Sequence, residues 1–332
     1  MLPHQQSHKK GFAGLIFTAS LLVVLAGGWL FRQDISDWYR LRQYTAPPEV
    51  VALAEQDTMT DEARKIFYTT HPKITGEEEF NANCRQGGAS EYSIVLGCYI
   101  SSGGLYGDMY LYDIDDERLS GVVQVTAGHE MLHAAYDRLS TKERQRVDAL
   151  LLQAYEDLPD GRIKETIAQY QANDPASVPS ELHSILGTEV RDLPAELNEY
   201  YSQYFADRLV VVAFSEQYEG EFARREAQVA DYDARLAGLK ANIEANQAEI
   251  DSRNAELSQK RAQLDSLEAS GDAAGFNALV ASYNAQVAAY NALVAETRTQ
   301  IETYNSLVEE RNSLALEVQE LTEAIDSRPE TL

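Results

Sequence analysis

The sequence predicts an α+β protein with an N-terminal transmembrane helix and a long C-terminal α-helical coiled-coil hairpin. Three observations lead to this prediction: a charge-free apolar run, two β-rich runs that precede a helical pattern, and hydrophobic residues that recur every seven positions through the last third. A chain of 332 residues is long enough for more than one domain. The expected segments are a short tail (1–10), a transmembrane helix (11–31), a juxtamembrane linker (32–57), an α+β domain (58–215) and the hairpin (216–328).

The predicted transmembrane helix, "GFAGLIFTASLLVVLAGGWLF", follows Lys9 and Lys10 and carries Trp29 near its outer end, where interfacial anchors are common. A cleaved signal peptide is the alternative, because residues 24–26 offer small side chains at a suitable spacing. The apolar run continues through Phe31, which favours an uncleaved anchor. We therefore expect a single-pass membrane protein. Its main body is placed outside the cytoplasm, since a short tail before a first span is typical of a signal anchor, although the flanking charges alone do not decide the orientation.

Charge and cysteine content restrict the partners and the compartment. The formal net charge of −25 argues against nucleic acid as a partner, because phosphate binding requires a basic patch. The two cysteines, Cys84 and Cys98, could form one disulfide that closes a loop, contributing about 3 kcal/mol in an oxidising compartment. Two buried free thiols are the alternative. The extracytoplasmic orientation favours the disulfide.

The α+β domain begins with a short amphipathic helix in "TMTDEARKIFY", with Thr60 as its cap and Ala63, Ile66 and Phe67 on its apolar face. Strands are expected in "EYSIVLGCYI" and "GDMYLYDID", where the second run alternates as a half-buried strand does. A helical period then runs through Val122, Val125, His129, Leu132, Tyr136 and Leu139. Further helices are expected in "TKERQRVDALLLQAYEDL", "RIKETIAQY" and "SELHSILGTEV", and from residue 194 almost to the end.

The last third repeats every seven residues from Phe222 to Leu264, as a coiled-coil seam does, although its second seam position is partly polar. A break containing Gly271 and Gly275 separates it from a second repeat that starts at Phe276. The break favours an antiparallel hairpin over the alternative of one parallel dimeric coil. The hairpin carries no recognisable chemistry, so we expect it to recruit a partner or to self-associate.

The segment "TAGHEMLHAAYDRL" places His129 and His133 four residues apart, with Glu130 after the first. On a helix the two histidines share one face and can bind one zinc ion at about 2.0–2.1 Å. Glu130 then lies beside the metal without binding it, where it can act as general base on a zinc-activated water. Two ordinary core or surface histidines are the alternative. His129 lies on the apolar stripe of the helix, where a buried ring needs a polar partner.

This motif resembles the H-E-x-x-H signature of the zincin metallopeptidases, and the resemblance covers roughly residues 58–215. It implies a small twisted sheet above the motif helix and a peptide substrate that lies along the strand before that helix, here "GDMYLYDID". In the gluzincin branch the third ligand is a glutamate on a later helix. Glu181 fits best because small residues follow it, whereas Glu189 and His183 remain alternatives. The family's usual Asp four residues after that glutamate is replaced by Ile185.

A peptidase also needs a group that stabilises the oxyanion. His183 and Tyr201 are candidates, as are the neighbouring Tyr200 and Tyr204, although helix packing is the simpler role for any one of these tyrosines. The predicted function is membrane-anchored zinc-dependent hydrolysis of peptide bonds. The alternatives are a non-enzymatic coiled-coil scaffold with a degenerate or binding-only domain, and a zinc hydrolase that acts on another kind of bond.

Overall fold

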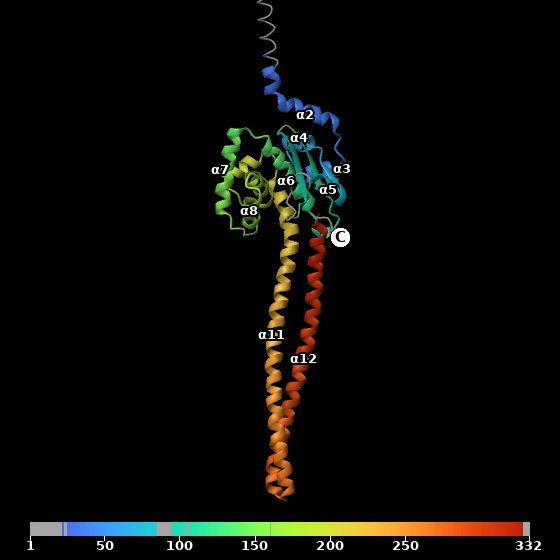
Figure 1. Ribbon diagram of the computed structural model, residues 1–332, viewed down its shortest axis with the longest axis vertical. Coiled ribbons are helices and arrows are strands. Elements are labelled where there is room, and N and C mark those ends of the chain that lie inside the picture. Colours follow the sequence, from blue (N-terminus) through green and yellow to red (C-terminus); the bar gives the residue numbers. More distant parts are fainter. Residues whose placement is uncertain (1–21, 23–24, 85–94, 104–105, 160, 328–332) are drawn as a thin grey trace, which may run out of the picture. The chain divides into compact units, whose positions relative to one another are not determined.

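The computed structural model describes residues 22, 25–84, 95–103, 106–159 and 161–327. These residues divide into two compact units, the first formed by Met1–Glu219 with Ala324–Leu332 and the second by Gly220–Glu323. Helices dominate both units (Figure 1). The helices of the first unit are α2 (Arg32–Gln43), α3 (Pro48–Gln56), α4 (Asp61–Thr69), α5 (Glu77–Cys84), α6 (Val122–Asp137), α7 (Thr141–Asp157), α8 (Gly161–Asn173), α9 (Val178–Glu189) and α10 (Ala195–Tyr201), with a 3₁₀ turn η2 (Glu117–Leu119).

The predicted α+β class is wrong, because the described chain is predominantly helical. Its strands are β1 (Lys73–Thr75), β2 (Gly97–Ser102) and β3 (Tyr106–Tyr112), which are only 3, 6 and 7 residues long. The helical period after residue 121 occupies far more of the chain than the short alternating segments do. The fold is therefore a helical assembly with a small sheet, and not a zincin-type α+β domain.

β3 is the central strand of this sheet, in which the order is β1-β3-β2. It pairs in parallel with β1 through Ile74 and Leu111, and antiparallel with β2 through Tyr99 and Met109. The expectation that "GDMYLYDID" is an open edge is therefore wrong, because β1 covers its far side. Among the described strands, β2 is an edge and lies against α6.

The prediction of a membrane-spanning, single-pass protein is also corrected. Within the described part of the chain, no helix combines the length and the apolar character needed to cross a bilayer. Most of the predicted span, residues 11–31, lies outside the described residues. After Phe31 the chain continues as α2, which contains three arginines and two aspartates in 12 residues, too polar for a bilayer interior.

The core of the first unit forms around α6, which contacts α9, β2, β3 and α4. The predicted helix at "TMTDEARKIFY" is confirmed as α4: Thr60 accepts a hydrogen bond from the amide of Ala63, and Ala63, Ile66 and Phe67 are buried. α3 adds Val50, Leu53 and Ala54 to the same core, upstream of the predicted start at residue 58. A hydrophobic core of this kind fixes the position of α6 and of the side chains it carries.

Close packing of α6 against α9 depends on Gly187. A Cβ at this position would lie 2.4 Å from Leu132 Cδ1 and 2.9 Å from Tyr201 Cε1, closer than carbon atoms approach without strain. Glycine thus lets the two helices approach closely. The side chains that face one another across α6 and α9 can then meet.

The second unit contains most of α11 (Arg208–Ala269) and α12 (Ala273–Ile325), joined by a turn in which Gly271 has a positive φ of 72°. Side-chain contacts pair Arg225 with Glu317, Tyr232 with Glu310, Asn246 with Gln300 and Lys260 with Ser282. As the residue numbers rise along α11, the numbers of their partners on α12 fall, so the two helices are antiparallel. A long C-terminal helical region was predicted, and its two helices are present.

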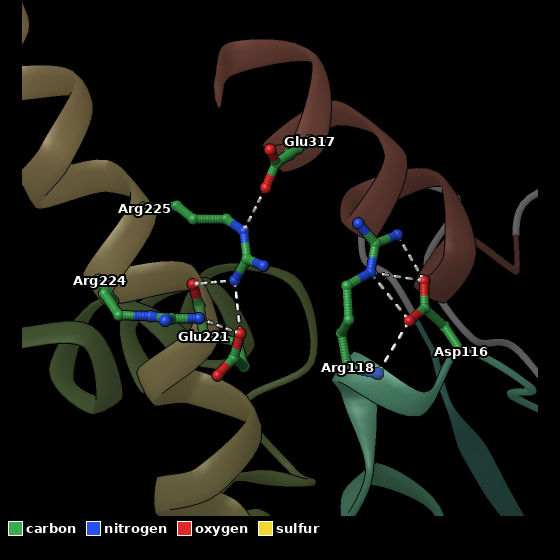
Figure 2. A network of polar contacts seen from close by, with 6 residues as sticks. All are labelled: Asp116, Arg118, Glu221, Arg224, Arg225 and Glu317. Atoms are coloured by element: carbon green, nitrogen blue, oxygen red, sulfur yellow. Dashed lines mark hydrogen bonds and ion pairs between the residues drawn. The ribbon is translucent and has the colours of Figure 1, made fainter. Parts of the chain in front are cut away.

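Ion pairs stabilise the base of this helical pair. Arg225 contacts Glu221 one turn earlier at 2.5 Å and Glu317 of α12 at 3.3 Å, while Arg224 also contacts Glu221 (Figure 2). The same figure shows a local pair in the first unit, where Asp116 accepts bonds from the amide and guanidinium of Arg118 and so caps η2.

Candidate metal centre

His129 and His133 lie one turn apart on α6, with their Nε2 atoms 3.1 Å apart. Within the described residues, they and Glu130 form a group of metal-ligand side chains whose ligand atoms lie within 4.8 Å of one another. The side chains of the two histidines are 19% and 15% exposed, so the group is mostly enclosed and still open to a small ion.

Glu181 reaches this pair from α9. Its Oε2 lies 3.6 Å from Nε2 of His129 and its Oε1 lies 3.6 Å from Nε2 of His133. Three ligand atoms held at about 2.0–2.1 Å in a tetrahedral zinc site are about 3.3 Å from one another. The observed separations of 3.1, 3.6 and 3.6 Å are close to that value. The two imidazoles and the carboxylate therefore fit a zinc ion in both donor type and spacing.

Glu189, the alternative ligand, has a different environment. Its Oε2 forms a 3.0 Å ion pair with Arg162 of α8. The ion pair offsets the cost of burying this carboxylate, because the side chain of Glu189 is only 12% exposed. Of the two carboxylates that the sequence left open, the structure brings Glu181 to the histidines and Glu189 to an arginine.

Glu130 lies on the side of α6 that faces β2. Burial raises the pKa of its carboxyl to about 7, with the charge of Glu181 adding to the rise and His129 opposing it. The backbone amide of Tyr99 donates to this carboxylate. A group with a pKa near 7 can both accept and return a proton at neutral pH.

Gly97 allows β2 to approach Glu130 this closely. A Cβ on Gly97 would lie 2.5 Å from Thr126 Cγ2 and 2.7 Å from Glu130 Cγ. No larger residue fits without displacing one of these side chains or the strand. The position of Glu130 is thus fixed from one side by α6 and from the other by the backbone of β2.

The second nitrogen of His133 has its own partner. Nδ1 lies 2.8 Å from Oγ of Ser180, the residue before Glu181. A hydrogen bond from Nδ1–H to the hydroxyl leaves the Nε2 lone pair directed toward His129 and Glu181. Such contacts orient metal-binding imidazoles and select their tautomer. No sequence pattern pointed to Ser180, because its contact with His133 depends on how α9 packs against α6.

The two histidines differ in their affinity for protons. Burial lowers the pKa of His129, but the carboxylates of Glu181 and Glu130 outweigh burial and raise it to about 9. Burial lowers the pKa of His133 to about 4, against the attraction of Glu181. The metal-free pair therefore carries one proton at neutral pH, which a metal ion would have to displace.

Two of the oxyanion candidates, His183 and Tyr201, lie inside the core. His183 is fully buried, its Nε2 lies 2.8 Å from the hydroxyl of Tyr200, and burial lowers its pKa to about 3. Tyr201 is also fully buried and donates to the backbone carbonyl of His183 at 2.7 Å. Both therefore help to hold α9 and α10 together, and neither presents a polar atom to solvent.

Tyr170 of α8 is a site residue that the sequence did not reveal. Its hydroxyl hydrogen-bonds Glu181, and burial together with the charges of Glu181 and Glu130 raises the pKa of this phenol. The surrounding segment was predicted to be helical, but nothing in that pattern links it to a residue eleven positions later. The phenol remains protonated at neutral pH and so can donate a hydrogen bond beside the histidines.

Cys84 and Cys98 form a disulfide between the end of α5 and β2. Cys98 lies between Gly97 and Tyr99, the two residues of β2 that contact Glu130. The bond therefore ties the strand beside Glu130 to a helix on the other side of the sheet.

Comparisons with protein-family models, curated proteins and solved structures found no match for this chain.

Proposed function

We propose that this protein is a zinc-dependent peptidase in which His129, His133 and Glu181 bind the metal and Glu130 is the general base. The observation that carries the proposal is the convergence of the two imidazole nitrogens and the Glu181 carboxylate at separations that suit one zinc ion. Three protein ligands leave one position open, as a catalytic zinc site requires. A structural zinc site would normally have four.

The chain's own residues supply the acid–base chemistry. A zinc ion held by His129, His133 and Glu181 would supply Lewis-acid chemistry and would lower the pKa of water to about 7. Glu130 takes the proton of the attacking water and then gives it to the leaving amine. The Tyr99 amide donates to this carboxylate and holds it in place for both transfers.

A peptide is the substrate that the sheet favours. In the antiparallel pair of β2 and β3, the amide of Tyr112 donates a hydrogen bond to the carbonyl of Leu96. Every second residue from Leu96 onward therefore directs its backbone amide and carbonyl toward β3. The backbone groups of Gly97 and the carbonyl of Tyr99 therefore point away from β3, toward the side on which Glu130 lies, whereas the amide of Tyr99 itself donates to Glu130. An extended peptide can add to such an edge through backbone hydrogen bonds.

The test compares full-length wild type, Glu130→Gln and His129→Ala for zinc content and for cleavage of quenched fluorescent peptides. Wild type should bind one zinc ion per chain and cleave peptides. Glu130→Gln should keep the zinc and lose about 10²–10⁴-fold in rate, because general acid–base groups contribute on that scale. His129→Ala should lose both properties. Glu165→Gln, an exposed glutamate of α8, is the matched control and should behave as wild type.

Each result has a distinct meaning. Equal activity of wild type and Glu130→Gln would contradict the assigned base. Failure of wild type to bind zinc would contradict the ligand set. A zinc-loaded wild type that cleaves no peptide would favour the non-enzymatic alternative, which the length of the α11–α12 hairpin and its lack of a candidate site support.

A further inference from the structure

Asp57 is a buried carboxyl that the proposed reaction does not use. It follows the last residue of α3 and is 0% exposed. Within the described part of the chain, neither of its carboxyl oxygens has a hydrogen-bond partner. Buried polar groups almost always have such a partner, and an ionised carboxylate without one is costly to bury. The environment of Asp57 therefore favours the neutral, protonated carboxyl.

Helices α6, α9 and α11 meet beside this carboxyl. A Cβ added to Gly128 of α6 would lie 3.5 Å from Oδ2 of Asp57. The same point is 3.3 Å from Cγ1 of Val211 on α11 and 3.4 Å from Cγ2 of Thr188 on α9. The carboxyl thus shares its space with methyl groups, which neither donate nor accept hydrogen bonds. The hydroxyl of Thr188 donates to the carbonyl of Ser184 at 2.8 Å.

The backbone after Asp57 keeps the side chain inside. Thr58 has a positive φ of 52°, a conformation that is strained for a β-branched residue. The Thr58 carbonyl accepts a hydrogen bond from the amide of Ala206 at 2.8 Å. The Thr58 hydroxyl donates to the carbonyl of Asp207 at 2.9 Å and accepts from the amide of Asp207 at 3.0 Å. Asp57 consequently cannot turn out to solvent unless this turn changes as well.

Burial raises the pKa of Asp57 well above its usual value. The nearest titratable residues along the surrounding segments are Glu55, His129, Glu189, Asp207 and Arg208. Glu55 and Asp207 are exposed, whereas the other three have partners elsewhere. Because an unfolded aspartate has a pKa of about 3.9, the folded chain keeps a proton that the unfolded chain has lost. The stability that this proton contributes is complete below about pH 4 and is lost as the pH rises through the raised pKa.

We propose that Asp57 is a proton-dependent latch at the junction of α3, α6 and α11. The neutral carboxyl keeps the junction closed. Loss of its proton leaves a negative charge among methyl groups, and the junction must open for water to reach that charge. α3 is the side that moves, because α6 and α9 are held together by their close contact at Gly187. Asp57 is not a candidate metal ligand, so the latch does not rest on the proposed function.

Urea unfolding of the full, chelator-treated chain tests the proposal. Fluorescence of Trp29 and Trp38 reports on the first unit, to which both belong. Relative to Asp57→Asn, which cannot ionise, the unfolding equilibrium constant of wild type should rise about tenfold per pH unit above about pH 4 until the raised pKa is reached. Asp192→Asn, a change at an exposed aspartate, is the matched control and should follow wild type. Parallel pH profiles for wild type and Asp57→Asn would overturn the proposal.

Hydrogen exchange locates the opening. At about pH 8 the amides of α3 should exchange faster in wild type than in Asp57→Asn, and at about pH 4.5 the two should exchange at the same rate. Comparison at equal pH cancels the pH dependence of exchange itself. The amides of α7 are the internal reference and should exchange alike in both proteins. Equal exchange of α3 at the higher pH, or an acceleration shared by α3 and α7, would overturn a local latch.

Discussion

Replacing Gly97 with alanine should reduce catalysis without removing the metal. The added Cβ would lie 2.5 Å from Thr126 Cγ2 and 2.7 Å from Glu130 Cγ, whereas carbon atoms in contact normally lie about 3.5–4.0 Å apart. Relief of this overlap requires a displacement of about 1 Å in Glu130, in β2 or in both. A misplacement of that size in a catalytic group can cost about 10²-fold in rate.

The metal ligands should be almost unaffected, because none of the three is among the atoms nearest to the added Cβ. We therefore expect kcat/KM for peptide cleavage to fall about a hundredfold, zinc affinity to change less than threefold, and stability to fall by about 1–3 kcal/mol from overpacking. The assays are peptide cleavage by the zinc-loaded enzyme, competitive zinc titration and thermal unfolding.

Gly76→Ala is the matched control, since a Cβ at Gly76 meets no atom within 4 Å and its φ is not positive. It should leave all three measurements near wild type. If Gly97→Ala cleaves peptides as fast as wild type, the close contact between β2 and Glu130 does not position the base. If zinc affinity falls in parallel with the rate, β2 supports the ligands and not Glu130 specifically.

Three further predictions concern the metal. Glu181→Gln should weaken zinc binding at least a hundredfold, whereas Glu189→Gln should change zinc binding little because Glu189 pairs with Arg162. A competitive chelator titration measures both affinities, and a larger loss for Glu189→Gln would contradict the assignment of Glu181. Ser180→Ala should weaken zinc binding about 10–100-fold while Ser180→Thr retains it, since the hydroxyl orients the imidazole of His133. Zinc affinity should rise with pH from about 6 to 9, because the pKa of His129 is raised and zinc must displace the proton on this imidazole. Calorimetry in two buffers should detect release of that proton at pH 7. A zinc affinity that does not change with pH would contradict the prediction.

The sequence predicted the helix of the candidate metal centre correctly because its signal is local. Hydrophobic residues at spacings of three and four specified α6, and the spacing of four between His129 and His133 specified their common face. The cap at Thr60 was predictable for the same reason, since an N-cap involves residues only three positions apart. Each of these features depends on geometry within one helix.

The choice of third ligand was not predictable in this way. Glu181 and Glu189 belong to the same helix and lie about 12 Å apart along its axis, given a rise of 1.5 Å per residue. Which of them meets the histidines depends on how α9 packs along α6, where Gly187 allows a close approach and Arg162 pairs with Glu189. Neither interaction leaves a pattern in the sequence around the glutamates.

Strands were predicted correctly at β2 and β3, but the prediction of which strand is the open edge was wrong for a related reason. β1 has only three residues, too few to show alternation, yet its parallel pairing makes β3 central and leaves β2 beside the site. β3 was mistaken for the open edge because β1 was not predicted from the sequence. Long-range strand order is determined by pairing between segments far apart in the chain, and one short missed strand is enough to reverse it.

The small size of the sheet does not alter the geometry of the candidate metal centre. α6 and α9 supply the three candidate ligands, and one backbone amide of β2 holds the fourth residue, Glu130. β3 is needed only to keep β2 in place, and the disulfide at Cys98 provides a second attachment. A sheet of three short strands can do this as well as a larger one. The separations among His129, His133 and Glu181 therefore depend on the packing of two helices and not on the size of the sheet beside them.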